Sequence, residues 1–440
     1  MRAKSTCAVL IGMSLLVAAC ERVNHENLDK WMRTKKGPDK LRAAVSDASI
    51  DADLSAHAAA NLLRKQLDSD ARDRLKALDA QRRSAVIAKL VPRLWDVARI
   101  EGGDLAVPNG EQASAKDLLV DLRGMVTGAE QAQIDGYLLD WYTSGFYDAR
   151  ATPGRHAGAE VVRMLGARAG EKLIPIANSV LAKGLAGAER LRLSDELLLA
   201  IAAAGSPETV KYLIELAGMS RGDKTQGRRA IGALYRAYVD PGGLFTVADP
   251  AGLAPHVQAL VGFATSDSEA RVINDAIALV RATGRPTCIE PLVAVAAYPH
   301  EQFEVRYIGA SAALSCGGPA AIAPVVAALP DDASYEHTIL GRAVWEAIAK
   351  MPERDKAVAE VRRLAQQPSK LARWVAIEAL AAMGDAADRE LVLSVASDRR
   401  KLRGYWGSQT DVSKKDRKVE PTLGDRAREL SQQLSGAKGS

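Results

Sequence analysis

Residue types that support catalysis or metal binding are few in this chain and lie far apart. No two of the six histidines fall within one helical turn of each other: His25, His57, His156, His256, His300 and His337. Zinc and related sites need His, Cys, Asp or Glu clustered at ligand spacing. The sequence therefore predicts no metal site, no cofactor and no small-molecule ligand.

Two glycine-containing motifs approach known catalytic patterns, and each lacks a defining feature. Gly166–Lys172 looks superficially like a phosphate loop, but three residues separate its glycines where four are needed, and Glu171 would meet the phosphate. Gly309–Ala313 lacks the last glycine of a nucleophile elbow and lies inside an expected helix. No acid pair or base stands beside a serine or cysteine, so we expect no enzymatic activity.

The first twenty residues carry the clearest chemical signal. A short positive start is followed by an apolar stretch of 12 residues, Ala8–Ala19, which is too short to cross a bilayer as a helix. Its end, Val17-Ala18-Ala19-Cys20, resembles a bacterial lipobox, in which the cysteine is diacylated and becomes the mature N-terminus. The alternative is an ordinary secretory peptide cleaved after Ala19, with Cys20 incidental.

Lipidation of Cys20 predicts a membrane-anchored protein. Two or three acyl chains on one residue give stable anchoring, unlike a single chain. By resemblance to enterobacterial sorting, Glu21 in place of aspartate favours the outer membrane over the inner membrane. No later segment is expected to cross a membrane, so the body of the chain is expected to face the periplasm as a soluble domain.

A repeated unit of 32 to 35 residues must position any site in the rest of the chain. Its most regular mark is an Ala-Leu or Ala-Ile pair near the end of every second helix. The pairs begin at Ala200, Ala233, Ala278, Ala313, Ala347 and Ala379, at intervals of 33, 45, 35, 34 and 32 residues. An insertion bracketed by Asp240–Gly243 and Asp249–Gly252 explains the interval of 45. A fixed period of two amphipathic helices indicates a solenoid, because one hairpin alone cannot bury its apolar face.

This repeat resembles the HEAT family. The likeness is closest in Val305–Leu314 and in Ala372–Leu380, where Val-Arg or Ala-Arg is followed by small residues and then Ala-Leu. The resemblance covers about Ala159 to Ser397 and implies an all-α fold, an α-α superhelix of antiparallel helix pairs. It also implies a binding scaffold, since such solenoids mostly bind other proteins.

Four segments follow from these patterns. They are a lipoprotein signal peptide (1–19), a tether with irregular helical hairpins (20–150), HEAT-like repeats (151–398) and a basic flexible tail with one candidate short helix (399–440). The formal net charge is +5, and loss of Arg2 and Lys4 with the leader leaves +3. Eight basic and two acidic residues give 399–418 a charge of +6, so the rest of the mature chain carries −3. A basic tail on a slightly acidic body argues against nucleic-acid binding.

Four arginines occupy similar places in successive repeats: Arg271, Arg306, Arg342 and Arg373. One interpretation is a ladder in which each arginine pairs with an acid of a neighbouring repeat, for which Asp267, Glu301 and Asp332 are available. The other is a row that binds anions along the concave face. The bidentate guanidinium suits both roles, and the ladder is the favoured interpretation.

Aromatic side chains supply the candidate surface for a protein partner. Trp141 and Tyr142 belong to a dense aromatic cluster on one helix, where core packing is the favoured interpretation. Tyr307 and Trp374 directly follow Arg306 and Arg373, and Trp345 lies on the same type of helix. These residues could line a concave groove, because Tyr and Trp are common interface anchors; the alternative is again core packing.

A disulfide is predicted between Cys288 and Cys316. Beyond the leader and Cys20 these are the only cysteines, and export would place them in an oxidising compartment. Cys288 starts one helix of a hairpin and Cys316 ends the other, so the two lie at the same end of an antiparallel pair. Buried free thiols are the alternative, since cysteine packs well as a small apolar residue.

These inferences together favour a lipid-anchored scaffold of the bacterial envelope that binds an unidentified protein along its solenoid surface. An enzyme or enzyme subunit acting on an envelope polymer or cofactor is the alternative from another class. A pocket that holds convergent acids, or a histidine beside an acid, would distinguish the two.

Overall fold

The computed structural model describes residues 22–100, 107–186, 192–219, 224–331, 335–383, 386–402 and 421–436. It divides into two compact units, Met1–Ala204 and Gly205–Ser440. The boundary lies inside the region, 151–398, that the sequence assigns to repeats. Cys20 and the leader lie outside the described residues.

The first unit contains eleven described helices. They are α1 (His25–Met32), α2 (Gly37–Ser46), α3 (Ala52–Arg64), α4 (Asp68–Ala77), α5 (Ala80–Ala98), α6 (Gly110–Arg123), α7 (Ala129–Thr143), α8 (Tyr147–Ala151), α9 (Gly158–Leu165), α10 (Ala167–Ala186) and α11 (Asp195–Ala204). Successive helices pack on one another, as in α2 on α3, α5 on α6 and α10 on α11, and further contacts join α3 to α5 and α9 to α11. The helices of this unit range from five residues in α8 to 20 residues in α10.

The second unit is built from regular helix pairs. Its elements are α12 (Pro207–Met219), α13 (Lys224–Tyr238), η1 (Pro250–His256), α14 (Val257–Ser266), α15 (Ala270–Ala282), α16 (Ile289–Ala297), α17 (Phe303–Gly317), η2 (Gly318–Ala321), α18 (Ile322–Ala328), α19 (Tyr335–Ala349), α20 (Arg354–Ala365), α21 (Lys370–Met383), η3 (Ala386–Asp388), α22 (Arg389–Ser394) and α23 (Leu423–Gly436). The elements η1, η2 and η3 are short 3₁₀ helices.

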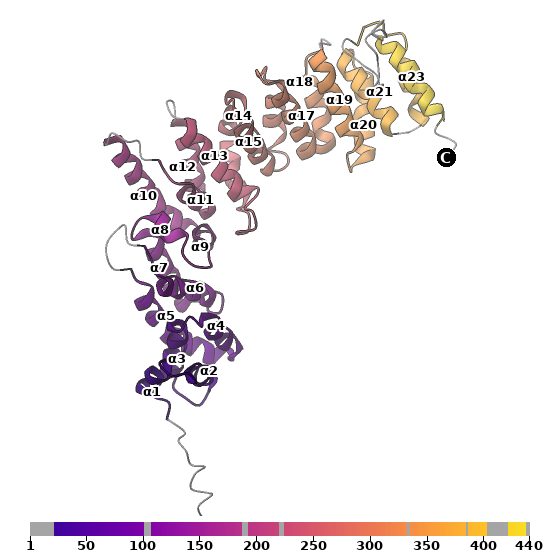
Figure 1. Cartoon of the computed structure of the whole chain (residues 1–440). Coiled ribbons are helices and arrows are strands. Elements are labelled where there is room, and N and C mark those ends of the chain that lie inside the picture. The colour runs from indigo at the N-terminus through magenta and orange to yellow at the C-terminus, as the bar shows by residue number, and fades with distance from the viewer. Residues whose placement is uncertain are drawn as a thin grey trace, which may run out of the picture. The chain divides into compact units, whose positions relative to one another are not determined.

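Within the second unit the helices form two layers (Figure 1). The second helices of the pairs, α13, α15, α17, α19, α21 and α23, pack side by side in one layer, and α14, α16, α18, α20 and α22 form the other. Short connections make the helices antiparallel in the pairs from α12/α13 to α20/α21, whereas a longer segment joins α22 to α23. The all-α prediction and its solenoid of antiparallel pairs are therefore confirmed. In the described ranges the β-type pairing amounts to one isolated bridge, between Lys401 and Thr422.

Local signals explain where several helices begin and end. Asn109 accepts from the Gln112 backbone N–H while the Gln112 side chain accepts from the Asn109 backbone N–H, a capping box that starts α6. Gly102-Gly103 and Pro108-Asn109-Gly110 predict a loop over Glu101–Ala115. That prediction is wrong from Gly110 onward, where α6 begins. Gly166, at φ +63°, turns the chain between α9 and α10, and the rest of the phosphate-loop-like motif is helical.

The C-terminal helix α23 closes the second unit. Leu423, Ala427, Leu430 and Leu434 are buried, and α23 packs on α21 and α22. The Arg426 guanidinium donates to both oxygens of Glu378 on α21, at 2.7 and 2.9 Å. The tail segment before it, 403–420, lies outside the described residues. The candidate short helix is thus part of the core and completes the last helix pair.

One stretch of the described chain, Phe303–Ala328, is apolar and long enough to cross a membrane by length and composition. The expectation that no later segment passes this test is wrong. The stretch comprises α17, η2 and α18, and 61% of its apolar window is buried inside the structure. A core helix of a soluble protein satisfies the same criteria, so this is weak evidence for a membrane span.

Candidate functional site

A groove between α15 and α17 is the best candidate for a binding site in the second unit. It has a volume of about 320 Å³ and is open to solvent. Asn274, Ile277, Ala278 and Arg281 line it from α15, and Tyr307, Ile308, Ser311, Ala312 and Ser315 line it from α17. Tyr307 is 42% exposed, a high value for an aromatic residue on a packed helix.

The groove combines an apolar floor with unused polar groups. The side chains of Asn274, Arg281, Tyr307, Ser311 and Ser315 make no hydrogen bond or ion pair with any residue that the structure describes. Its lining includes one cation and no carboxylate. A ligand would therefore find apolar contact, free donors and acceptors, and one guanidinium.

The structure corrects two other predicted members of this surface. Trp374 is 3% exposed, and its indole N–H donates to Glu378 at 3.0 Å. Its ring packs so closely on Gly341 of α19 that a Cβ there would come within 2.5 Å of it. Arg306 is also buried, and its Nε donates to the Ala296 carbonyl at 2.9 Å. Both residues belong to the packed interior, so their assignment to an exposed groove is wrong.

Trp345 and Arg373 are half-buried. The indole N–H of Trp345 is buried without a hydrogen-bond partner among the described residues. Arg373 donates to the Gln367 carbonyl at 2.6 Å and pairs with Asp398 at 3.2 Å. Neither lines the α15–α17 groove, and their roles in partner binding stay predictions.

Trp141 and Tyr142 are core residues. Each is 1% exposed, and the Trp141 indole N–H donates to the Arg150 carbonyl at 3.1 Å. The core interpretation is therefore confirmed for both side chains, and the alternative that they contact a partner on the surface is wrong. From the same cluster Phe146 is 45% exposed.

The arginine ladder takes a different form from the predicted one. Arg271 and Arg342 pair within their own helices, with Asp275 at 3.9 Å and Glu346 at 2.8 Å. Asp267, a predicted ladder acid, instead pairs with Arg228 of α13 at 2.9 Å. Asp332 lies outside the described residues. Of the four predicted arginines, Arg373 does pair with an acid of the next repeat, Asp398 at 3.2 Å, so the ladder is confirmed for that residue.

Cys288 and Cys316 form a disulfide in the structure. Their sulfur atoms lie 2.02 Å apart and their Cα atoms 6.5 Å apart. The bond joins the start of α16 to the end of α17, at the hairpin end that the sequence pattern predicts.

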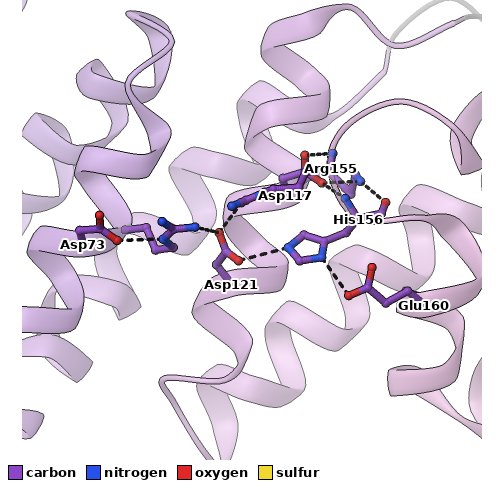
Figure 2. A network of polar contacts seen from close by, with 8 residues as sticks. Asp73, Asp117, Asp121, Arg155, His156 and Glu160 are labelled. Atoms are coloured by element: carbon purple, nitrogen blue, oxygen red, sulfur yellow. Dashed lines mark hydrogen bonds and ion pairs between the residues drawn. The ribbon is translucent and has the colours of Figure 1, made fainter. Parts of the chain in front are cut away.

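The first unit contains a buried polar network that the sequence reasoning missed (Figure 2). Lys116 of α6 is fully buried, and its Nζ lies 2.6 Å from Asp117 Oδ1 and 2.9 Å from the His156 carbonyl. Asp117 in turn accepts from the backbone N–H groups of Arg155 and His156. A Cβ on Gly154 would meet this carboxylate at 2.6 Å. The pair thus fixes the loop before α9 on α6.

His156 lies between two carboxylates in this network. Its Nε2 is 3.1 Å from Asp121 and its Nδ1 is 3.1 Å from Glu160. The hydrogen bond with Asp121 raises the pKa of His156, burial opposes that shift, and Glu160 adds to it. Burial raises the pKa of Asp121, but the hydrogen bonds from His156 and Arg155 outweigh it, and the net pKa is lowered.

The geometry of the network favours structural anchoring over catalysis. Both ring nitrogens of His156 face carboxylates, so neither is free to accept a proton from a substrate. Lys116 is completely enclosed, and burial lowers its pKa in spite of Asp117. The sequence signal for such a buried pair was the adjacent Lys116 and Asp117, which directly precede the apolar residues Leu118–Val120.

A second missed cluster joins the first and third helices. His25 and His57 are 32 residues apart in sequence, yet their Nδ1 atoms lie 2.7 Å apart. His57 Nε2 lies 2.7 Å from Asp29, and His25 Nε2 lies 3.3 Å from Asp53. Among the described residues no group of three or more His, Cys, Asp or Glu side chains is arranged to hold a metal ion.

Comparison with known proteins leaves the chain without an assigned family. No family model matches it, and no curated protein matches it. Solved structures with low similarity include an engineered protein, with 15% identity over 90% of this chain and 98% of the other, at a TM-score of 0.31.

Two further solved structures are natural proteins. Human deoxyhypusine hydroxylase in complex with glycerol has 17% identity over 68% of this chain and 98% of its own, at a TM-score of 0.24. The karyopherin Kap121p, bound to the extreme C-terminus of the phosphatase Cdc14p, has 11% identity at a TM-score of 0.29. That match covers 88% of this chain and 50% of the karyopherin. At these scores the likenesses add nothing to the fold that the helix packing establishes.

Proposed function

We propose that the protein is a lipid-anchored scaffold of a bacterial cell envelope and binds a protein partner through its second unit. The signal-like leader ending in Cys20 supports anchoring, and Glu21 favours the outer membrane, facing the periplasm. The solenoid of helix pairs supports a binding role, because stacked repeats present an extended surface. Neither unit needs to catalyse a reaction for this role.

The observation that carries the proposal is the α15–α17 groove with its exposed Tyr307. A half-exposed tyrosine offers apolar contact and a hydroxyl at low entropic cost, as interface anchors do. The free side-chain amide of Asn274 and the hydroxyls of Ser311 and Ser315 can pair with the backbone of an extended segment. The groove therefore fits an extended stretch of polypeptide better than a compact cofactor.

Charge narrows the class of partner. Arg281 is the cation that lines the groove, and its side chain makes no ion pair with a described residue. The lining contains no carboxylate. A carboxylate is the natural partner of its bidentate guanidinium. We therefore propose that the bound segment carries an aspartate, a glutamate or a free C-terminus beside Arg281.

Site-specific photocrosslinking tests this proposal. A photoreactive amino acid replaces Tyr307 in one strain of the native host and Tyr298 in another. Tyr298 is a matched control, because it is 45% exposed and lies in the same unit but outside the groove. The expected result is a discrete adduct with one protein from position 307 and none from position 298.

The adduct should also depend on charge. Arg281→Glu should reduce it at least about tenfold, because a like charge would face the partner's carboxylate. Arg271→Glu, at an exposed position of the same helix outside the groove, should leave the adduct unchanged. Equal adducts from positions 307 and 298, or an adduct indifferent to Arg281→Glu, would overturn the proposed site.

A further inference from the structure

The contact between α1 and α3 depends on how protons are distributed over two imidazoles. Four ring nitrogens of His25 and His57 make three contacts, of which one joins the two rings. The other two join Nε2 of each ring to a carboxylate, His57 to Asp29 and His25 to Asp53. An ionised carboxylate only accepts hydrogen bonds, so each Nε2 must carry a hydrogen.

The number of ring protons that satisfies this arrangement is three. Two of them occupy the Nε2 atoms, and one lies between the two Nδ1 atoms. Two neutral imidazoles carry two protons in total, so the complete arrangement is one imidazole beside one imidazolium. A fourth proton would place two N–H groups face to face at 2.7 Å and abolish the ring–ring bond.

Both carboxylates are held ionised by other groups. Burial raises the pKa of Asp29, but the hydrogen bonds from Asn61 and His57 outweigh it, and the net pKa is lowered. The hydrogen bond from Arg93 of α5 lowers the pKa of Asp53, with burial opposing it. The need for a hydrogen on each Nε2 therefore persists well into the acid range.

The charges around the rings come from all the neighbouring helices. Arg64 of α3 lies near Asp29, and Arg93 and Lys89 of α5 lie near Asp53. From α2, Lys40 sits over the ring of Trp31, 5.1 Å from its centroid. Of these cations, Arg93 also lowers the pKa of His57, so it adds to the repulsion that a second imidazolium would meet.

We propose that the His25–His57 pair is an acid-labile latch that holds α1 on α3. Protonation of the second ring breaks the ring–ring bond and loosens α1. Loss of the third proton as the pH rises also leaves one of the three contacts without a hydrogen. Docking of α1 is therefore strongest at intermediate pH and weaker on both sides.

The direction in which acidic pH changes the docking of α1 follows from the pKa of His57. Burial lowers the pKa of His57, while Asp29 opposes that shift. A histidine whose folded pKa is lowered takes up a proton on undocking, so its contribution is lost as the pH falls below the ordinary histidine value of about 6.5. Burial of Leu28 and Trp31 still holds α1 in the core, so the pair adjusts the docking rather than controlling it alone.

The latch would act on the membrane tether, a consequence that rests on the proposed lipidation of Cys20. Since α1 is the first described helix after Cys20, undocking it adds the twelve residues 25–36 to the tether. A fully extended chain of that length spans about 40 Å. The latch itself does not depend on the lipid or on the groove, and its test does not involve them.

Hydrogen exchange of the purified mature chain tests the latch. Protection factors of the α1 amides, corrected for the intrinsic rate at each pH, are measured from about pH 5 to pH 9. Amides in the middle of α5 serve as the internal reference. We expect α1 protection to pass through a maximum and to fall at least about tenfold toward pH 5, the change that one pKa unit produces.

Variants separate the latch from general acid sensitivity. His57→Gln keeps a donor for Asp29 but removes the second titrating ring, so the acid fall should disappear. His25→Asn should reduce it, because an amide oxygen can accept from a protonated His57 where a second imidazolium cannot, while burial of His57 remains. This second variant serves if His57→Gln does not dock α1. His156→Gln, in the other polar network of the unit, should keep the wild-type profile.

The wild-type measurement alone can overturn the proposal. Constant α1 protection from pH 7 to pH 5 would do so, as would an acid fall of equal size in α1 and α5. Survival of the acid fall in both His57→Gln and His25→Asn would assign it to other groups.

Discussion

Single residues decide how the first unit tolerates charge in its interior. Removing a lysine from water is costly unless a partner compensates it, and Lys116 meets this condition through Asp117 and a backbone carbonyl. The same carboxylate fills the space left by the missing side chain of Gly154. Burial of the pair therefore fixes a loop geometry as well as a charge.

His156 predicts a pH dependence of stability in the first unit. Its folded pKa is raised, chiefly by Asp121. Its contribution is therefore fully present below about pH 6.5 and is lost as the pH rises through the folded pKa. Urea unfolding should show that His156→Gln lowers the free energy of unfolding more at pH 6 than at pH 9, by on the order of 1 kcal/mol.

This sign is opposite to that of the His25–His57 pair, so the two clusters are distinguishable by experiment. His300→Gln, in the second unit, controls for the loss of a histidine as such. A destabilisation by His156→Gln that is equal at both pH values would show that its protonated form has no special role.

At the scale of elements, α23 contributes more to the stability of the second unit than its position after a basic segment indicates. Glu378 of α21 is 3% exposed, and its carboxylate is held by Arg426 and by the Trp374 indole N–H. Arg426→Ala would leave a buried carboxylate without its cation. We expect a loss of about 3–5 kcal/mol in the free energy of unfolding.

Arg428 provides the matched control on the same helix. Its ion pair with Asp425 is more than half exposed on both sides, so Arg428→Ala should cost less than about 1 kcal/mol. Denaturant unfolding monitored by the second unit's helical signal measures both. Similar costs for the two variants would mean that α23 does not depend on the buried pair.

The disulfide makes a second prediction at this scale. It closes a loop between residues separated by 28 positions, and the chain-entropy model gives it about 3–4 kcal/mol of stability. Mass spectrometry after alkylation should find Cys288 and Cys316 unmodified without reductant and both modified with it. Two alkylated cysteines in the unreduced protein would exclude the bond.

At the scale of the whole molecule, the signal-like leader and the basic segment 399–418 are sequence features outside the helix pairs. The chain has a formal net charge of +5, and 399–418 carries +6, so the remaining residues together carry 5 − 6 = −1. A short basic segment beside a nearly neutral remainder differs from the basic face that is typical of nucleic-acid-binding domains. Protein binding at one groove is compatible with such a body.

Lipidation is the prediction that concerns the molecule as a whole. Cys20→Ser should move the protein from the membrane fraction to the soluble periplasm or leave it unprocessed. The reason is that the acyl chains on Cys20 would supply the membrane affinity. Cell fractionation with immunodetection measures the change, and Cys7→Ser, which replaces a cysteine of the leader outside the lipobox, is the control. Normal processing with continued membrane association of Cys20→Ser would mean that another feature anchors the chain.

The sequence by itself determined the helical class, the repeat and the position of the disulfide. Hydrophobic periodicity is a local property, so it can be read without knowing what each helix meets. The two cysteines were predictable because an antiparallel hairpin brings one start and one end together. The Asn109 and Gln112 spacing of a capping box was also present in the sequence and marks the start of α6.

Only the tertiary structure decided which similar residues are exposed. Tyr307 and Trp374 both follow an arginine on the second helix of a pair, yet Tyr307 is exposed and Trp374 is buried. Gly341 on α19 leaves room for the Trp374 ring, and α23 pairs with Glu378 beside it. The pairing of His25 with His57 was hidden for the same reason, because periodicity gives the apolar face of a helix but not the helix that covers it.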